Sequence, residues 1–367
     1  MASSMTLPSS SRSAPRRRLC ALRMVAAVLL VGAAACTVEA QPLNSPRWLP
    51  QAMSTPLGEE FKIAYDDGDA LHTLHSLGFA KLAEGHYQRK VDLLPHGTLV
   101  PSAMDDLPEI DAIAVISIHR PFLGDKQYAY DTLRSLMAHL PKQAQINMLV
   151  GNADTDYLSH DVLVREIGQE DAERVHITPT PQDVAQFFVG EGISTGPRAA
   201  WNYARALRSY GGSQHLLLLE DDVSLSANGV AHLQKYLSEP PVSLFALFND
   251  RCAAIEPTWS RPDSALTIGA KLIERNSDFP TLQAMVYASE VANDAGEYLV
   301  TRAGRESHDY MLGRFFGQTR SVLGYVQPSI AQHEGRRTTG LSGPNSVPWS
   351  TCYAPELPPV GDGNQAL

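Results

Sequence analysis

Cysteine is scarce in this sequence, and the spacings of the common cofactor sites are absent from it. The 367 residues include only four cysteines: Cys20, Cys36, Cys252 and Cys352. No CxxC pair and no Cys/His zinc spacing is present, which excludes the usual structural zinc modules. GxGxxG, Walker A and internal repeats are also missing, so those modes of nucleotide binding and a repeat fold have no support.

Positive charge is scarce outside the N-terminal segment. The net charge is −10, and the first 38 residues carry five arginines and no acidic residue, so the remainder carries −15. The negative charge of the chain after residue 38 repels nucleic-acid phosphates, which argues against a general nucleic-acid-binding protein. A composition of 44% hydrophobic and 19% charged residues excludes a disordered chain. A phosphorylated ligand would need a divalent cation or a local arginine.

The N-terminal apolar run is shorter than a typical membrane span. Met24 to Val38 is 15 residues long and follows a group of arginines, whereas a spanning helix needs about 20 apolar residues. This pattern predicts that residues 1–40 are a signal peptide, cleaved before Gln41, or an uncleaved signal anchor. A lipobox-like AAAC before Cys36 is a third interpretation. All three interpretations place the rest of the chain outside the cytosol. There Cys252 and Cys352 either form a disulfide or stay reduced.

Strand-like and helix-like segments alternate after residue 112. We expect residues 41–111 to form a stem and N-terminal extension with a helix over 70–86, and residues 345–367 to form a Pro-rich extended tail. The alternation over residues 112–344 predicts an α/β fold with a mostly parallel central sheet and helices on both faces. Residues 250–279 are expected to be irregular. The expected strands are 113–118, 146–152, 175–180, 215–219, 242–248, 282–288 and 321–326, and the expected helices are 128–140, 161–170, 197–209, 289–302 and 308–316.

An acidic triplet ends the run of leucines in "HLLLLEDDVSL". Because side chains alternate along a strand, Glu220 and Asp222 should point the same way and Asp221 the opposite way. Carboxylates that converge at the end of a buried strand repel one another unless a cation binds between them. Oxygen ligands favour a hard ion such as Mn²⁺ or Mg²⁺. The alternative is an acidic cap for the turn that follows.

Further polar residues lie at predicted element ends. His333 follows the last strand, and it is either structural or completes a mixed oxygen and nitrogen site with Asp222, which favours Mn²⁺ over Ca²⁺. Arg198 and Asn202 share one helix face, where they either contact a phosphate or sugar or face solvent. Asp309 is either a helix N-cap or a carboxylate that orients an acceptor hydroxyl.

Several segments resemble one enzyme family in the expected order. "LLLLEDD" resembles the DxD-type motif of metal-dependent GT-A glycosyltransferases, with Asp221 at the variable position. The sequence is most similar to the type IV N-glycan-branching β-1,4-N-acetylglucosaminyltransferases and their relatives. The similar segments are "SIHRP", "YDTLRSL", "MLVGNADTDY", "RAAWN" and "QPSIAQHEGRRTT", which fall within residues 113–339.

This resemblance implies a GT-A fold and an inverting transfer of N-acetylglucosamine or a related hexose from a UDP-sugar to a glycan, glycoprotein or glycolipid. It implies Mn²⁺ or Mg²⁺ as the cofactor. The implied location is the lumen of the Golgi or another secretory compartment, where the protein is either held by a type II membrane anchor or secreted. Asp309 would be the catalytic base, and Asp156 would meet the uridine or form a turn. The implied metal ligands are Asp222 and His333, and the implied donor-binding residues are Glu220, Asp221, Arg198, Asn202, His119, Arg120 and Asp154.

The sequence also departs from this family. Residues 250–279 have no counterpart, and no lectin-like module follows Pro344 in the given sequence. The acceptor is therefore open. One alternative is a GT-A galactosyl- or N-acetylgalactosaminyltransferase that acts on a glycolipid or anchor glycan. Another is an exported, non-catalytic protein in which the triplet only holds a metal ion.

Overall fold

The chain divides into two units, Met1–Ser45 and Pro46–Leu367. The predicted targeting segment and stem boundary at residue 40 lie outside the described residues. Within the described part, no helix has the length and apolar character needed to cross a membrane. The computed structural model describes residues 60–62, 79–83, 86–89, 98–151, 154–182, 184–186, 195–238, 242–249, 259–261, 264–274, 282–302, 308–335 and 349–360.

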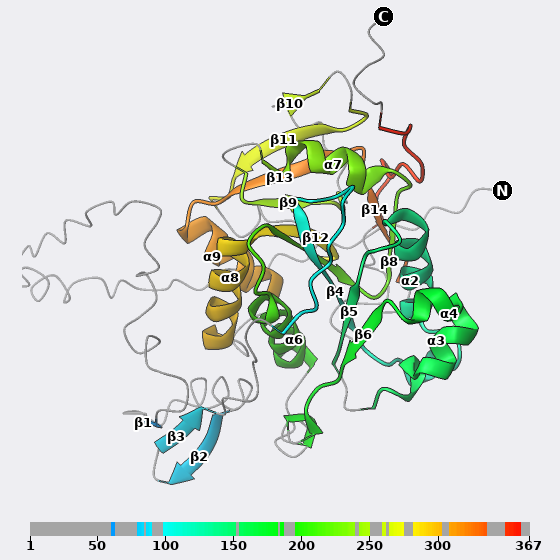
Figure 1. Cartoon of the computed structure of the whole chain (residues 1–367). Helices are drawn as coiled ribbons and strands as arrows, with labels where there is room; N and C mark the ends of the chain where they lie inside the picture. The colour runs from blue at the N-terminus through cyan, green and yellow to red at the C-terminus, as the bar shows by residue number, and fades with distance from the viewer. Residues whose placement is uncertain are drawn as a thin grey trace, which may run out of the picture. The chain divides into compact units, whose positions relative to one another are not determined.

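A nine-stranded mixed sheet forms the centre of the described residues (Figure 1). Its strand order is β10-β11-β13-β9-β12-β7-β4-β5-β6. Strands β4, β5, β6, β7, β9, β10 and β13 run in one direction, and β11 and β12 run in the other. The predicted α/β class with a mostly parallel sheet is therefore confirmed. The strands are β4 (Ile110–Ser117), β5 (Ile146–Val150), β6 (Val175–Thr178), β7 (His215–Glu220), β9 (Leu244–Ala246), β10 (Trp259–Ser260), β11 (Thr267–Leu272), β12 (Ala284–Ala288) and β13 (Val322–Gln327).

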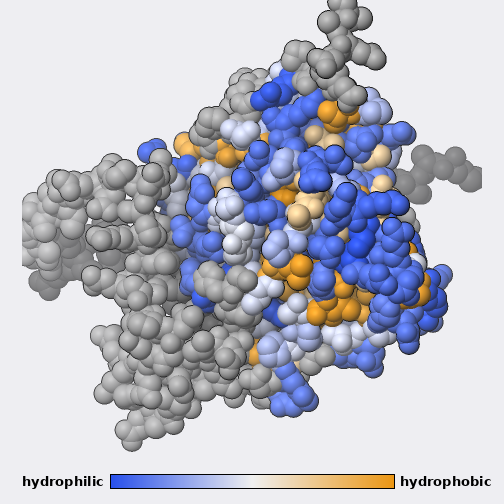
Figure 2. Space-filling model, in the orientation of Figure 1, coloured by the Kyte–Doolittle hydropathy of each residue, from blue (hydrophilic) through white to orange (hydrophobic). Residues whose placement is uncertain are grey.

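Helices cover both faces of this sheet, as the continuous apolar strands predict. Leu216 and Leu218 pack in one core cluster with residues of α6, α8 and α9. Leu217 and Leu219 pack in a second cluster with residues of α2, α3 and α7. Figure 2 shows a mostly hydrophilic surface over α3 and α4. The helices are α2 (Tyr128–His139), α3 (His160–Ile167), α4 (Gln169–Ala172), α6 (Thr195–Ser209), α7 (Gly229–Leu237), α8 (Ser289–Arg302) and α9 (His308–Gln318), with short 3-10 turns η3 (Pro121–Leu123) and η4 (Asp156–Leu158).

Three sequence predictions about local structure were wrong. The helix predicted over 70–86 is replaced at its C-terminal end by β2 (Phe79–Ala83) and β3 (His86–Arg89), which pair with β1 (Glu60–Lys62). The helix predicted over 161–170 is split, because Gly168 adopts φ 91° between α3 and α4. The stretch expected to be irregular contains β10 and β11, whose pairing with β13 comes from outside the local sequence.

A separate two-stranded sheet lies at the end of β7. It pairs β8 (Val223–Leu225) with β14 (Ala331–His333) in antiparallel register. Residues 349–358, here named the C-terminal strap, contact both sides of this pair through Ser329 and Ala227. Cys352 in the strap is disulfide-bonded, and the other three cysteines lie outside the described residues. The residues predicted as a tail therefore pack on the α/β domain over this part of their length.

Candidate functional site

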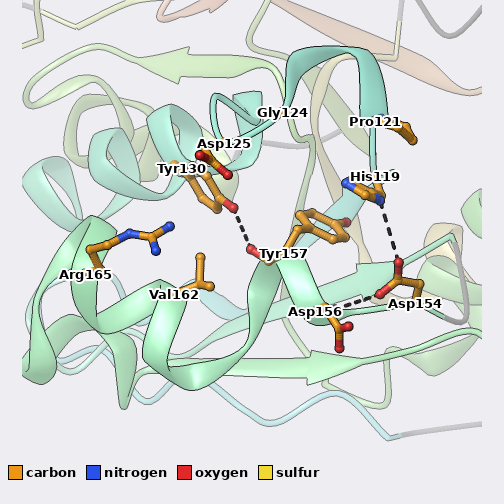
Figure 3. Close-up of a pocket in the computed structure, with 10 residues that line it drawn as sticks. All are labelled: His119, Pro121, Gly124, Asp125, Tyr130, Asp154, Asp156, Tyr157, Val162 and Arg165. Atoms are coloured by element: carbon orange, nitrogen blue, oxygen red, sulfur yellow. Dashed lines mark hydrogen bonds and ion pairs between the residues drawn. The ribbon is translucent and has the colours of Figure 1, made fainter.

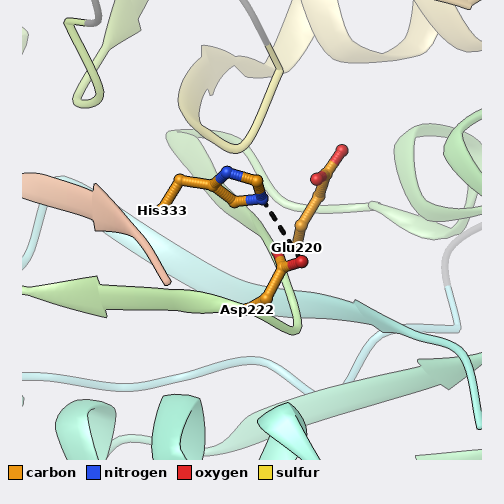
Figure 4. A group of neighbouring side chains, drawn as sticks. All are labelled: Glu220, Asp222 and His333. Atoms are coloured by element: carbon orange, nitrogen blue, oxygen red, sulfur yellow. Dashed lines mark ion pairs between the residues drawn. The ribbon is translucent and has the colours of Figure 1, made fainter. Parts of the chain in front are cut away.

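The acidic triplet lies at the carboxyl end of β7, beside the end of β4. Glu220 is the last residue of β7, and Asp221 and Asp222 form the turn into β8. Ligands of open α/β sheets bind outside the carboxyl ends of the strands. Glu220, Asp222 and His333 each bring one ligand atom within 4.8 Å of the others (Figure 4). The two carboxylates expected on one side thus meet a histidine from a distant segment.

The pairing of β8 with β14 brings His333 to Asp222. His333 is the register partner of Val223, the residue after Asp222. The Nε2 atom of His333 lies 3.3 Å from Oδ2 of Asp222, and both side chains are buried. The backbone N–H of Glu334 donates to the carbonyl of Asp222 at 2.7 Å, which holds the two segments together.

Asp221 points to the other side and is held by protein groups. Its Oδ2 accepts hydrogen bonds from Oγ of Ser117 at 2.7 Å and from the N–H of Ile118 at 2.9 Å. Its Oδ1 accepts one from Arg120 at 2.7 Å. Asp221 therefore ties the end of β4 to the end of β7. Asp221 is not among the three residues whose ligand atoms converge, and the structure gives this donor-binding candidate an anchoring position.

Arg120 is a buried cation between two of the three acids. Its Nη1 pairs with Asp221, its Nη2 lies 3.3 Å from Oδ2 of Asp222, and its guanidinium lies 5.2 Å from the ring centroid of Tyr128. Burial by itself lowers the pKa of Arg120, but the charges of Asp221 and Asp222 raise it above its usual value. Arg120 thus stays positively charged and compensates one of the three carboxylates.

Glu220 is half-buried and contacts the hydroxyl of Tyr203 at 3.1 Å. The same hydroxyl lies 2.7 Å from the carbonyl of Leu282. Burial, and then the charge of Asp222, raise the pKa of Glu220 to about 7. Burial also raises the pKa of Asp222, but the hydrogen bond and the charge of His333 lower it. The pKa of that carboxyl therefore lies below its ordinary value. The charge of Asp222 therefore opposes the ionisation of Glu220, which a shared cation would relieve.

The cluster has the donor atoms, charge and space of a divalent cation site. With all three carboxylates ionised and His333 neutral, as a metal ligand must be, Arg120 leaves two negative charges uncompensated. Oδ1 of Asp222 is buried and has no hydrogen-bond partner among the described residues. Gly335 has no Cβ, and one built there would collide with Asp222 and lie 3.1 Å from Nε2 of His333. Two carboxylates and one imidazole suit Mn²⁺, Mg²⁺ or a similar ion.

A cavity of about 370 Å³ lies at the ends of β4 and β5 (Figure 3). The rings of His119 and Tyr157 stack there with centroids 4.7 Å apart. Asp154 lies 3.9 Å from Nδ1 of His119, and it also accepts a hydrogen bond from the N–H of Asp156 at 2.9 Å. The structure thus brings His119 and Asp154 together, next to Arg120. The full lining is His119, Pro121, Gly124, Asp125, Tyr130, Asp154, Asp156, Tyr157, Val162 and Arg165.

Three other predicted residues lie on helices near these strand ends. Arg198 belongs to α6, but its side chain lies outside the described residues. Asn202 is buried against Gly151, where an added Cβ would come 2.6 Å from its Nδ2. Its Oδ1 has no hydrogen-bond partner within the described part of the chain. Asp309 lies in the first turn of α9, where a negative charge stabilises the helix N-terminus.

Sequence reasoning missed four residues of this site. Ser117 donates to Asp221, Tyr157 stacks on His119, Tyr203 contacts Glu220 and Gly335 leaves room beside Asp222. Only Gly335 carried a usable signal, because a glycine two residues after a candidate ligand suggests a close approach of the backbone. Serine and tyrosine at strand ends and on helices are too common to be singled out without the fold.

Comparisons with known proteins found fold-level similarity only. No protein family model matches the sequence, and no curated protein matches it significantly. One similar solved structure is the galactosyltransferase LgtC with donor and acceptor sugar analogs, with TM-score 0.33 and 11% identity over 58% of this chain and 72% of that chain. Another is core-mannan synthase A (CmsA/Ktr4) from Aspergillus fumigatus in its Mn/GDP form, with TM-score 0.33 and 11% identity over 73% of this chain and 95% of that one.

Proposed function

We propose that this protein is a metal-dependent GT-A glycosyltransferase that moves a hexose from a UDP-sugar to a glycan acceptor with inversion. The observation that carries the proposal is the cluster of Glu220, Asp222 and His333 beside Arg120, at the carboxyl end of β7. The charge of Asp222 raises the pKa of Glu220, and a divalent cation between the two carboxylates would offset this repulsion. The same cation can bind a diphosphate.

The residues of the cluster fit a shared role toward a diphosphate. Asp222 and His333 would hold Mn²⁺ or Mg²⁺, and Glu220 would contribute to the metal or the ribose. When bound, the metal supplies Lewis-acid stabilisation of the charge on the leaving group. Arg120 is already fixed by Asp221, so its positive charge is preorganised beside the same site. Arg198 and Asn202 would add contacts to phosphate or sugar from α6.

The cavity at the ends of β4 and β5 supports the proposal that a nucleoside binds there. The stacked rings of His119 and Tyr157 offer a flat surface, and Asp154 offers a carboxylate beside them. His119 lines the cavity and the next residue, Arg120, pairs with Asp222, so one ligand that spans the two places is proposed. A nucleoside diphosphate has the required parts, with an aromatic base at one end and two phosphates at the other.

Asp309 is the proposed base for the acceptor. Its Oδ1 is buried and has no hydrogen-bond partner among the described residues, so the hydroxyl of a bound acceptor would satisfy it. In the proposed step the acceptor oxygen forms a bond to the anomeric carbon as the bond from that carbon to the diphosphate oxygen breaks. The acceptor proton moves to the carboxylate of Asp309. Attack from the face opposite the leaving group gives inversion.

The test is a UDP-release assay with purified protein over a panel of UDP-sugars, with and without Mn²⁺. We expect release that requires Mn²⁺ and one preferred donor, and Asp222→Asn should lose it. The panel should contain UDP-linked N-acetylglucosamine, galactose and N-acetylgalactosamine, which separates the branching-type donor from its alternatives. Absence of UDP binding in the presence of Mn²⁺ would contradict the proposal and favour a non-catalytic metal-binding protein.

We further propose a location in the lumen of the Golgi or another secretory compartment, where nucleotide sugars are supplied. The basic and apolar N-terminal segment supports this proposal. Microscopy of the full chain carrying a C-terminal fluorescent tag tests it, and a cytosolic distribution would contradict it.

A further inference from the structure

The C-terminal strap contacts both strands of the small sheet that carries the proposed metal ligands. Ser329, before β14, donates its N–H to the carbonyl of Cys352 at 3.2 Å and accepts from the N–H of Ala354 at 3.1 Å. After β8, the N–H of Ala227 donates to the carbonyl of Pro355 at 3.0 Å. The hydroxyl of Ser226 also donates to the carbonyl of Ala354. The strap therefore bridges the segments that follow Asp222 and precede His333.

The contact nearest to His333 is a two-point pairing of Gln332 with Ser350. The side-chain Nε2 of Gln332 donates to the carbonyl of Ser350 at 3.2 Å, and its Oε1 accepts from the N–H of Ser350 at 3.0 Å. Both residues are almost fully buried, with 1% and 2% of their surface exposed. The hydroxyl of Ser350 donates to the carbonyl of Asn249 at 2.7 Å. The pairing thus fixes Gln332, the residue before His333, to the strap. Ser350 in turn connects the strap to Asn249, which follows β9.

The far end of the strap has separate anchors. The side-chain amide of Asn228 donates to the carbonyl of Leu357 at 2.8 Å. His232, on α7, contacts the carbonyl of Pro358 at 2.8 Å. Leu357 is buried in the second core cluster. These contacts hold the strap on the domain without touching β14, so the two ends of the strap can be tested independently.

We infer that Gln332 is a positioning residue for His333 and that the C-terminal strap is a required support of the metal site. The inference rests on the proposed function, because it assumes that His333 and Asp222 bind a cation. His333 lies at the last position of a three-residue strand, and the segment after it begins with the close approach of Gly335. So short a strand does not fix a side chain by its own ladder. Metal ligands require such fixation, and loss of a supporting contact commonly weakens metal affinity 10- to 100-fold.

The experiment measures Mn²⁺ affinity of the full chain, with Mn²⁺ alone as the probe, by electron paramagnetic resonance. Gln332→Met removes both hydrogen bonds to Ser350 and keeps the side-chain length. Ser350→Ala is a milder second variant that removes the hydroxyl contacts to Asn249 and Cys352 and keeps the backbone pairing with Gln332. Asn228→Asp is the matched control, because it removes one hydrogen bond at the far end of the strap and tolerates the positive φ of that position. The unfolding temperature of each variant is measured in parallel.

We expect Gln332→Met to weaken Mn²⁺ binding by about 10-fold, and Ser350→Ala to weaken it by a smaller factor. Asn228→Asp should lower the unfolding temperature and leave Mn²⁺ affinity unchanged. If Gln332→Met does not fold, Gln332→Asn decides, because its shorter amide cannot reach both backbone groups of Ser350. Wild-type affinity in the folded Gln332 and Ser350 variants would overturn the inference while leaving the proposed function intact. Failure of the wild-type chain to bind Mn²⁺, or undiminished binding by Asp222→Asn, would overturn the metal site and the inference with it.

Discussion

Asp222 and His333 face each other at 3.3 Å across the β8–β14 pair, although they lie far apart in the sequence. Each comes from a segment that the other holds in place, since Glu334 donates to the backbone of Asp222 and Ser224 donates to the side chain of Glu334. The contact joins a carboxylate at the end of a buried strand to an imidazole from a separate strand.

Asp222→Asn should abolish Mn²⁺-dependent UDP release while the protein stays folded. The amide keeps the shape of the side chain but removes the charge that a divalent cation requires. Asp131→Asn, on the exposed side of α2, is the control and should keep full activity. Activity is measured by UDP release and folding by circular dichroism. Full activity of Asp222→Asn would remove the metal site from the mechanism.

Gly335→Ala should weaken Mn²⁺ binding by at least about 10-fold. Its Cβ would collide with the carboxylate of Asp222 and crowd Nε2 of His333, so one of the two ligands must move. Gly317→Ala is the matched control, because its Cβ would make only an ordinary contact with Glu274, at 3.5 Å, near the end of α9. That control should be neutral or slightly more stable. Equal Mn²⁺ affinities in the two variants would show that Gly335 does not shape the site.

Tyr203→Phe should weaken Mn²⁺ binding by about 10-fold, because the hydroxyl that contacts Glu220 and Leu282 orients the carboxylate. Tyr236→Phe removes another buried hydroxyl, which contacts the carbonyl of Leu266 at 2.8 Å beneath α7. The hydroxyl of Tyr236 also accepts a hydrogen bond from the N–H of Arg261 at 3.0 Å, so each variant loses up to two hydrogen-bond contacts. Each should therefore lose about 1–2 kcal/mol of unfolding free energy, at a net value of about 1 kcal/mol for one hydrogen bond. Calorimetric titration with Mn²⁺ separates them. Equal Mn²⁺ affinities in the two variants would contradict a role of the Tyr203 hydroxyl in orienting Glu220.

His308 should make the protein less stable in mild acid. It is buried against the ring of Tyr203, with centroids 4.6 Å apart, and burial lowers its pKa from 6.5 to about 4. The unfolded chain therefore binds a proton between pH 6.5 and 4 that the folded chain does not, so folding stability is full above pH 6.5 and falls as the pH drops toward 4. The loss is on the order of 3 kcal/mol at most.

His308→Gln removes this titration. Urea unfolding at pH 7.5, 6, 5 and 4 should show a shallower decline of unfolding free energy in His308→Gln than in the wild type. Parallel declines in the two proteins would mean that His308 is protonated in the folded state.

Asp309→Asn should reduce the rate of transfer by about 100-fold or more and keep the affinity for Mn²⁺ and UDP. The amide cannot accept the acceptor proton, whereas donor binding does not depend on it. Asp161→Asn is the control for the effect of charge in a first helical turn, since Asp161 has that position in α3. Single-turnover kinetics with saturating donor measure the chemical step. An unchanged rate would assign the base to another residue.

Local patterns were sufficient for most elements of the α/β domain. The strand ending at Glu220 was predictable because four consecutive leucines can be buried only where both faces of a strand are covered. The convergence of Glu220 and Asp222, without Asp221, was expected from the alternation of side chains. β10 and β11 were missed, because their stability depends on pairing with β13, and Gly168 split a helix through a backbone conformation that periodicity does not reveal.

The sequence by itself determined the order of strands and helices, the position of three acids at a strand end and the acidic charge of the body. Only the tertiary structure decided that His333 meets Asp222, that Arg120 joins Asp221 to Asp222, and that the strap supports both ligands. The reason is physical. Side-chain periodicity acts within one segment, whereas the partners of a buried charge depend on which distant strands pair and on how the chain returns to them.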